Sequence, residues 1–108
     1  MADQTTRIRD LNDAFRKAMP RDVYLTAGLS GLPAKIQTEA IRRVKTFDAF
    51  NEDNDPHAEH DFGAFDVEGQ KIFWKIDCYD PNLEFGSADP TDESKTRRVL
   101  TIMLAEEY

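Results

Sequence analysis

The sequence of 108 residues predicts one small α+β domain, with elements in the order α-β-α-β-β-α and a small, mainly antiparallel sheet packed with helices. Three observations lead to this fold class. Two stretches in the first half repeat apolar residues at helical spacing, and two stretches in the second half alternate apolar and polar residues. A chain of this length forms one hydrophobic core, so residues 1–108 are expected to be a single domain.

The first predicted element is an amphipathic helix over residues 5–19. Apolar side chains recur there at steps of three and four, at Ile8, Leu11 and Phe15. Pro20 is expected to end the helix because its ring cannot continue the backbone hydrogen bonding. The polar positions between the apolar ones are Arg7, Arg9, Asp10, Asp13, Arg16 and Lys17.

A short strand and a second helix are expected next. Residues 22–27 are rich in β-forming residues and end at Gly28, which indicates a strand that leaves through a turn. From Pro33, apolar residues again recur at helical spacing, with basic residues on the other side. The apolar positions of this helix are Ile36, Ala40, Ile41, Val44 and Phe47.

A long loop and a hairpin follow in the prediction. Residues 48–61 have neither period and contain Pro56, so they form a loop of about a dozen residues, a length often associated with function. Residues 62–68 and 71–79 then alternate around Glu68-Gly69, where glycine suits a type I′ turn.

This hairpin register assigns the side chains to two faces. Phe65 lies opposite Ile72, and Gly63 lies opposite Trp74. One face then carries Phe65, Val67, Ile72, Trp74, Ile76 and Cys78, and the other carries Phe62, Phe73 and Tyr79 beside an Asp66–Lys71 pair. Three aromatic residues on the second face imply a cover over both sides of the sheet, from a helix or from a partner molecule.

The last segment, residues 91–106, gives conflicting indications. The residues Asp89-Pro90-Thr91-Asp92-Glu93 are typical of a helix start, which favours a helix. Val99, Thr101 and Ile102 are β-branched, which favours a strand. We predict a helix here, with a strand as the alternative.

The charge of the chain is −7 and is unevenly distributed. Residues 1–46 hold nine basic and five acidic side chains, whereas residues 47–108 hold five and sixteen. An acidic chain repels phosphate backbones and anionic lipid, so we expect no direct contact with nucleic acid and none with a membrane. Eight of the eleven aromatic residues lie between Phe47 and Phe85, within the acidic half, so this half is expected to fold and not to form a solvated tail.

Cysteine usage and the absence of long apolar stretches indicate the cell compartment. Cys78 is the single cysteine, which excludes an internal disulfide and any zinc site that needs two thiolates. No basic segment precedes an apolar run at the N-terminus, and no apolar stretch approaches the roughly 20 residues that cross a bilayer. We therefore expect a cytoplasmic protein, with Cys78 in the core and no cofactor.

The chain resembles a known family in four stretches: TAGLSGLP at 26–33, TFDAFNEDNDPHAEHDFG at 46–63, FWKIDCYD at 73–80 and RVLTIMLAEEY at 98–108. They are similar to an uncharacterised bacterial domain-of-unknown-function family (family 3768), found in proteobacteria and often associated with plasmids or prophages. The resemblance spans nearly the whole chain and implies a bacterial, cytosolic protein with a link to mobile elements. It transfers no catalytic residue, and Cys78 stands where such sequences more often have an aromatic residue.

The loop is the candidate binding site because it concentrates acidic and imidazole side chains. The candidate partner-binding residues are Glu52, Asp53, Asp55, His57, Glu59, His60 and Asp61. Their spacing matches neither an EF-hand loop nor the His-Glu-x-x-His motif of zinc proteases. A simpler interpretation is that Asp and Asn form turns while the histidines cap or pack.

Our main hypothesis is a non-enzymatic acidic interaction module that binds a basic protein surface through this loop and nearby strand ends. The family resemblance adds a mobile-element inhibitor or nucleic-acid mimic as a specific form of it. One alternative is a metal-dependent enzyme, with Asp53, Asp55, His57 and His60 as ligands and Glu59 as the acid–base group. Another alternative is a homodimer that covers the aromatic face of the sheet, since the sequence leaves the oligomeric state open.

Overall fold

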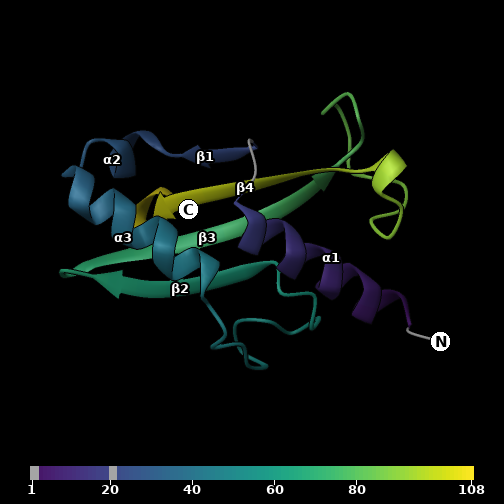
Figure 1. Cartoon of the computed structure of the whole chain (residues 1–108), viewed down its shortest axis with the longest axis horizontal. Helices are drawn as coiled ribbons and strands as arrows, with labels where there is room; N and C mark the ends of the chain where they lie inside the picture. Colours follow the sequence, from purple (N-terminus) through teal and green to yellow (C-terminus); the bar gives the residue numbers. More distant parts are fainter. Residues whose placement is uncertain (1–2, 20–21) are drawn as a thin grey trace.

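The computed structural model describes residues 3–19 and 22–108, and its elements are arranged around one sheet (Figure 1). The elements are α1 (Gln4–Ala18), β1 (Val23–Leu25), α2 (Ala27–Ser30), α3 (Ala34–Lys45), β2 (Phe62–Val67), β3 (Gln70–Tyr79), the 3-10 turn η1 (Glu93–Lys95), β4 (Arg97–Leu104) and the 3-10 turn η2 (Ala105–Glu107). The predicted helix end at Pro20 lies outside the described residues.

The sheet has four strands in the order β1-β4-β3-β2. The pairs β2–β3 and β3–β4 are antiparallel, and the short β1 runs parallel to β4. The sheet is therefore mixed but mainly antiparallel, and the predicted α+β class is confirmed.

The predicted hairpin is confirmed in its register and its turn. Phe65 pairs with Ile72, and Gly63 pairs with Trp74. Glu68 and Gly69 both have positive φ, 47° and 82°, as a type I′ turn requires. Because the register is right, the division of the hairpin side chains between the two faces is right as well.

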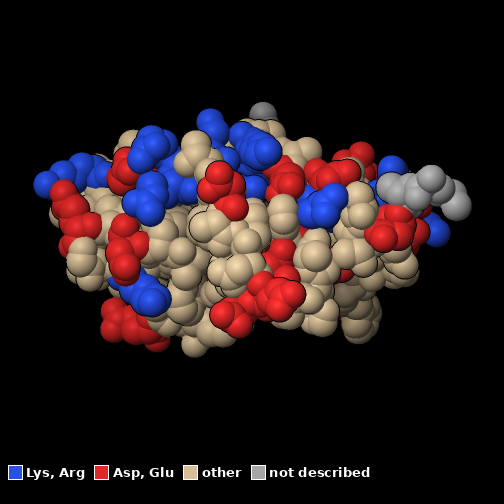
Figure 2. All heavy atoms as spheres, turned by 90° about the horizontal axis from the view of Figure 1, so that it is seen from below, with Lys and Arg blue, Asp and Glu red and all other residues tan. Residues whose placement is uncertain are grey.

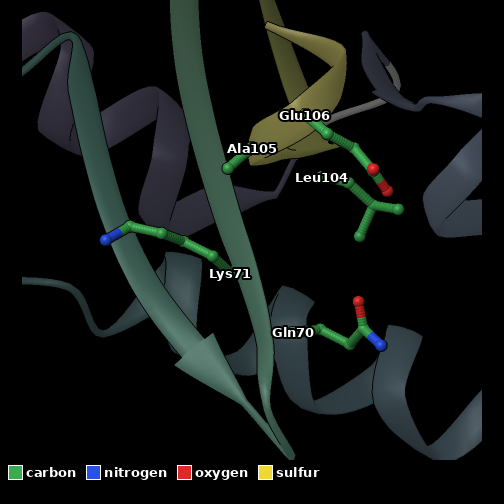
Figure 3. A pocket seen from close by; sticks show the side chains of 5 residues that line it. All are labelled: Gln70, Lys71, Leu104, Ala105 and Glu106. Carbon is green, nitrogen blue, oxygen red and sulfur yellow. The ribbon is translucent and has the colours of Figure 1, made fainter.

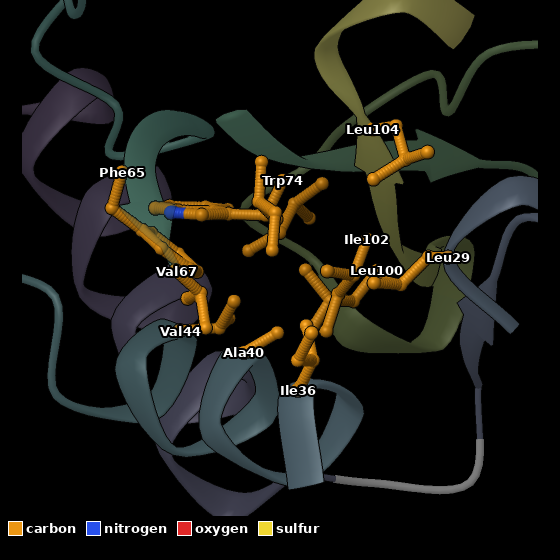
Figure 4. Packing of buried hydrophobic residues seen from close by; sticks show 12 residues of the cluster. Leu29, Ile36, Ala40, Val44, Phe65, Val67, Trp74, Leu100, Ile102 and Leu104 are labelled. Atoms are coloured by element: carbon orange, nitrogen blue, oxygen red, sulfur yellow. The ribbon is translucent and has the colours of Figure 1, made fainter. Parts of the chain in front are cut away.

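The helices α1 and α3 lie against one face of the sheet (Figure 1). In Figure 4, Ile36, Ala40 and Val44 project from α3 toward the core, where Trp74 is fully buried. Alternate residues of β3 and β4 complete this cluster, so the second helix has the apolar face that its spacing predicts.

The first helix differs from its prediction in one respect. Arg16, which the sequence assigns to the polar side, is 1% exposed. Asn12 and Ile8, one and two helical turns before it, are also buried. These three residues are spaced by four, so they share a face. The buried face of α1 is thus partly polar, because it meets the loop 48–61 as well as the core.

The last segment is a correction to the sequence-based expectation. Residues 91–106 do not form a helix: β4 pairs with β3 over eight residues and with β1 over three. The helix-start residues are used locally instead, since the Asp92 carboxylate accepts the N–H of Ser94 at the start of η1. Of the β-branched residues, Val99 and Thr101 lie on one face of β4 and Ile102 is buried on the other.

Candidate functional site

The loop 48–61 is held in shape by hydrogen bonds between its own residues. The side-chain oxygen of Asn51 accepts the backbone N–H groups of Asp53 and Asn54, at 2.8 and 3.0 Å. Asn54 returns the contact, since its Oδ1 accepts the N–H of Asn51 at 2.9 Å and its amide nitrogen donates to the carbonyl of Ala49. The expectation that Asn residues build turns here is therefore correct.

Asp55 is the buried centre of the loop, with 7% of its surface exposed. Its Oδ1 accepts the backbone N–H groups of Glu59 and His60, both at 3.1 Å. Its Oδ2 lies 3.6 Å from Nε2 of His60. One carboxylate thus closes the turn that contains Pro56, His57 and Ala58.

His60 joins the loop to α1. Its Nδ1 lies 2.9 and 3.0 Å from the two carboxylate oxygens of Asp13, and its ring stacks on Phe50 with centroids 3.7 Å apart and an angle of 3°. The imidazole therefore lies between two carboxylates, those of Asp13 and Asp55. This contact fixes the loop against the helix layer.

Arg16 extends this contact into the core. One of its terminal nitrogens donates to the carbonyl of Val44 at 2.6 Å, and the other donates to Asp13 at 3.1 Å. The guanidinium carbon lies 5.6 Å from the ring centroid of Phe50 and 5.1 Å from that of Trp74. The buried charge is thus paired and stacked, which offsets much of the cost of its desolvation.

A second polar contact holds the end of the loop. Asn12 donates to the backbone carbonyl of Glu59 at 2.9 Å and accepts from Arg98 of β4 at 2.7 Å. Arg98 also donates to the carbonyl of Pro90 at 2.6 Å. None of Asn12, Asp13, Arg16 and Arg98 was among the predicted site residues, and the one indication available was the spacing of four along the first helix.

The remaining candidate residues face outward or lie at the surface. Glu52, Asp53 and His57 are exposed, whereas Glu59 and Asp61 are half-buried. Burial and the nearby Asp61 raise the pKa of Glu59, against a smaller effect of His57. Burial also raises the pKa of Asp61, together with the nearby Asp55, against the opposing effects of its own backbone N–H and of His57. In the part of the chain that the structure describes, neither carboxylate forms an ion pair with Lys or Arg.

The loop does not bring the proposed metal ligands together. Asp55 and His60 are occupied by contacts within the protein, and Asp53 and His57 are exposed. Over residues 3–19 and 22–108, no group of three or more His, Cys, Asp or Glu side chains is placed to hold a metal ion. The geometry therefore does not support the metal-dependent alternative.

Cys78 lies on the same face of β3 as Trp74 and Ile76 and is half-buried. Burial raises the pKa of its thiol, and the cationic Arg98, which pairs with it across the sheet, opposes that effect. A raised pKa keeps the thiol protonated and unreactive. The position agrees with a packing role at the edge of the core.

Several hollows mark the surface, and two of them lie at the loop and at the hairpin end. A shallow one of about 260 Å³ lies on the loop beside Phe50, Glu52 and His60. Another of about 260 Å³ lies at the hairpin end of the sheet, where Figure 3 shows Lys71 pointing away from Glu106. The second hollow therefore does not bring charged groups together.

Charge is also segregated on the surface. Figure 2, seen from below the view of Figure 1, shows many Lys and Arg side chains along the upper margin, with Asp and Glu both beside them and on the uncharged surface below. Basic residues Arg42, Arg43 and Lys45 lie in the last turn of α3. On this face the basic side chains are therefore concentrated along one margin, whereas acidic side chains are spread more widely.

Comparison with known proteins identifies the chain by family alone. No curated protein and no solved structure matches it. Among the described residues, no helix is both long and apolar enough to cross a membrane. The model of a family described as protein of unknown function (DUF3768) matches residues 25–107, and since this is most of the sequence, the chain belongs to that family.

Proposed function

We propose that this chain is a non-enzymatic interaction module that binds the basic surface of another protein through the acidic side of the loop 48–61. The binding residues are the exposed Glu52, Asp53 and His57 together with the half-buried Glu59 and Asp61. The observation that carries the proposal is the electrostatic state of the last two. Both carboxylates have raised pKa values, and neither forms an ion pair with a Lys or Arg of the described chain.

A raised pKa means that the surroundings disfavour the carboxylate anion. Burial and neighbouring acids do so here, and they act on Glu59 and Asp61 in the unbound protein. A Lys or Arg from a partner would favour both anions, so binding would remove an unfavourable interaction that folding leaves in place. An ordinary exposed carboxylate, already well solvated, gains much less from such a partner.

The loop is also ordered before it binds. The Asp55 carboxylate accepts two backbone N–H groups of the loop, and His60 contacts Asp13 of α1. Asn12 of α1 also donates to the carbonyl of Glu59. A partner therefore does not have to supply the free energy of ordering this segment. In this view the two inward-facing residues position the binding residues and do not contact the partner.

The charge of the second half of the sequence supports association at longer range. Residues 47–108 hold sixteen acidic and five basic side chains, and this excess attracts a basic surface before contact. Such attraction is screened by salt, over a Debye length of about 10 Å at 0.1 M. We therefore expect the association to weaken steeply as salt is added.

The family resemblance suggests the biological setting of this proposal. We place the protein in the bacterial cytoplasm, with a link to plasmids or prophages. An inhibitor of a host protein, or a mimic of nucleic acid that occupies a basic groove, is the form of the proposal that combines this setting with the acidic loop.

The test uses an oligolysine peptide as the probe and backbone amide chemical shifts of the full chain as the readout. We expect the peptide to shift the amides of residues 51–61 first, and its affinity to fall as NaCl is added. The double variant Glu59→Gln, Asp61→Asn should lose about five- to tenfold in affinity, because it removes two favourable ion pairs.

The matched control is Glu84→Gln with Glu93→Gln, which changes the net charge equally at two exposed positions outside the loop. Its affinity should stay within about twofold of the unchanged chain. If both double variants lose affinity equally, the peptide responds to net charge alone and the proposed site is wrong. If the shifted amides lie outside the loop, the proposal is overturned as well.

A further inference from the structure

The second face of the sheet has the composition of an interface. Alternation along the strands places a row of Tyr24, Thr101, Lys75 and Phe62 across it, from β1 through β4 and β3 to β2. A second row, Met103, Phe73 and Ala64, runs beside the first. The helices α1 and α3 lie against the other face (Figure 1), whereas on this face Tyr108 packs on Phe62 and Phe73 and Met103 is 3% exposed, so the first row offers more accessible surface than the second.

Aromatic side chains cluster on this face. Phe62, Phe73 and Tyr108 contact one another edge to face, with ring centroids 5.2 to 5.8 Å apart. Tyr108 is 76% exposed, and Tyr24, on the same face at the opposite edge of the sheet, is 50% exposed. Tyrosine and phenylalanine in such positions are typical of the buried centre of protein interfaces.

The charges on this face cancel. Asp22 accepts two hydrogen bonds from Arg97, both at 2.9 Å, and Lys75 lies 2.8 Å from Asp77. The remaining two charged residues of the strands on this side, Asp66 and Lys71, are direct neighbours across the hairpin. The charged residues that the strands place on this face thus sum to zero, in a chain whose net charge is −7.

We propose that a second copy of this chain covers this face, so that the protein forms a symmetric dimer through the two aromatic sheets. Two chains of charge −7 repel each other, and a neutral face is where they can meet with the least like-charge contact. A basic partner would gain nothing from this neutral surface, whereas a second copy brings the same aromatic and self-paired residues to it.

The proposal is independent of the acidic loop. The loop is anchored through Asn12 and Asp13 of α1, which lies on the opposite face of the sheet. A dimer formed through the aromatic face therefore leaves the loop of each copy accessible. The two proposals can succeed or fail separately.

The test measures the mass of the full chain in solution by sedimentation equilibrium over a range of protein concentrations. We expect twice the monomer mass at high concentration. Tyr24→Asp should raise the dissociation constant of the dimer by about tenfold or more, since both copies carry the substitution in the same interface. Phe85→Asp is the matched control: this residue is 71% exposed in the loop after β3, and its variant should dimerise like the unchanged chain.

Amide spectra show whether each variant is folded, and Tyr108→Asp gives a second variant on the same face should Tyr24→Asp fail to fold. Added NaCl should strengthen the dimer, because it screens the repulsion between two acidic chains. A monomeric mass at every concentration overturns the proposal and leaves the face to a different protein. A dimer that Phe85→Asp disrupts while Tyr24→Asp and Tyr108→Asp do not would overturn it equally.

Discussion

Replacing Asp55 by Ala tests whether one buried carboxylate holds the candidate binding loop in place. The change removes the acceptor of two backbone N–H groups, those of Glu59 and His60, both 3.1 Å from Oδ1. Hydrogen bonds to a charged group contribute about 1.5–3 kcal/mol each, and because both amides are only partly buried, water recovers some of that free energy. We therefore expect the free energy of unfolding to fall by about 2–4 kcal/mol.

For a domain of about this size, that loss lowers the melting temperature by roughly 10–20 °C. Urea unfolding gives the free energy, and hydrogen exchange of the two amides shows whether the damage is local. Asp55→Asn keeps one oxygen acceptor without the charge and should lose about half as much.

The matched control for this prediction is Asp53→Ala, two residues earlier in the same loop. Asp53 is exposed, and in the described part of the chain its carboxylate accepts no hydrogen bond, so the change should stay within about 0.5 kcal/mol. Equal losses for the Asp55 and Asp53 variants would refute the idea that Asp55 organises the loop. So would unchanged exchange rates at Glu59 and His60.

Two further predictions concern packing and charge. Gly63→Ala should lower stability by about 1–3 kcal/mol in thermal unfolding, because its Cβ would lie 2.4 Å from Nε1 of Trp74, whereas Gly86→Ala, with no atom within 4 Å, should melt like the unchanged chain. Glu59→Gln with Asp61→Asn should raise stability at pH 7, because both acids bind protons more tightly in the folded state and their ionisation therefore destabilises it. That gain should disappear as the pH falls through the raised pKa values toward the ordinary ones of 4.5 and 3.8, and a gain that persists at acid pH would contradict the electrostatic explanation.

The hairpin could be predicted from the sequence because its determinants are local. Glu68 and Gly69 fix the turn, the turn fixes the register, and the register decides which face receives Trp74 and which receives Phe73. Each step depends on residues close together in the chain. The same holds for the second helix, whose spacing of Ile36, Ala40 and Val44 matches the buried side of α3.

The last segment could not be assigned from local information. Asp92 is a good cap in either setting, and here it starts a single 3-10 turn. Residues 97–104 become a strand because β3 and β1 both pair with them, and those pairings join segments that are distant in sequence. Long-range pairing outweighed a local helix start.

For the candidate site, the sequence indicated the loop but not the residues that hold it in place. Composition alone located the acidic loop and its exposed carboxylates. The residues that hold the loop were missed because their contacts are long-range: His60 meets Asp13 across 47 positions, and Arg16 meets Val44 across 28. Arg16 is a charged residue on the same helix face as the apolar Ile8, and such a local inconsistency in an amphipathic helix indicates a long-range contact.

The two proposed surfaces respond to salt in opposite directions, and this follows from the way the fold distributes charge. At the loop, Glu59 and Asp61 form no ion pair with a Lys or Arg of the described chain, so attraction to a basic partner should weaken as salt screens it. On the aromatic face, Arg97 and Lys75 are already paired with acids, so salt removes only the repulsion between two acidic chains. Increasing NaCl should therefore release an oligolysine probe while it strengthens the dimer. If both associations weakened together, the net charge of the chain, and not the local arrangement of these residues, would govern its contacts.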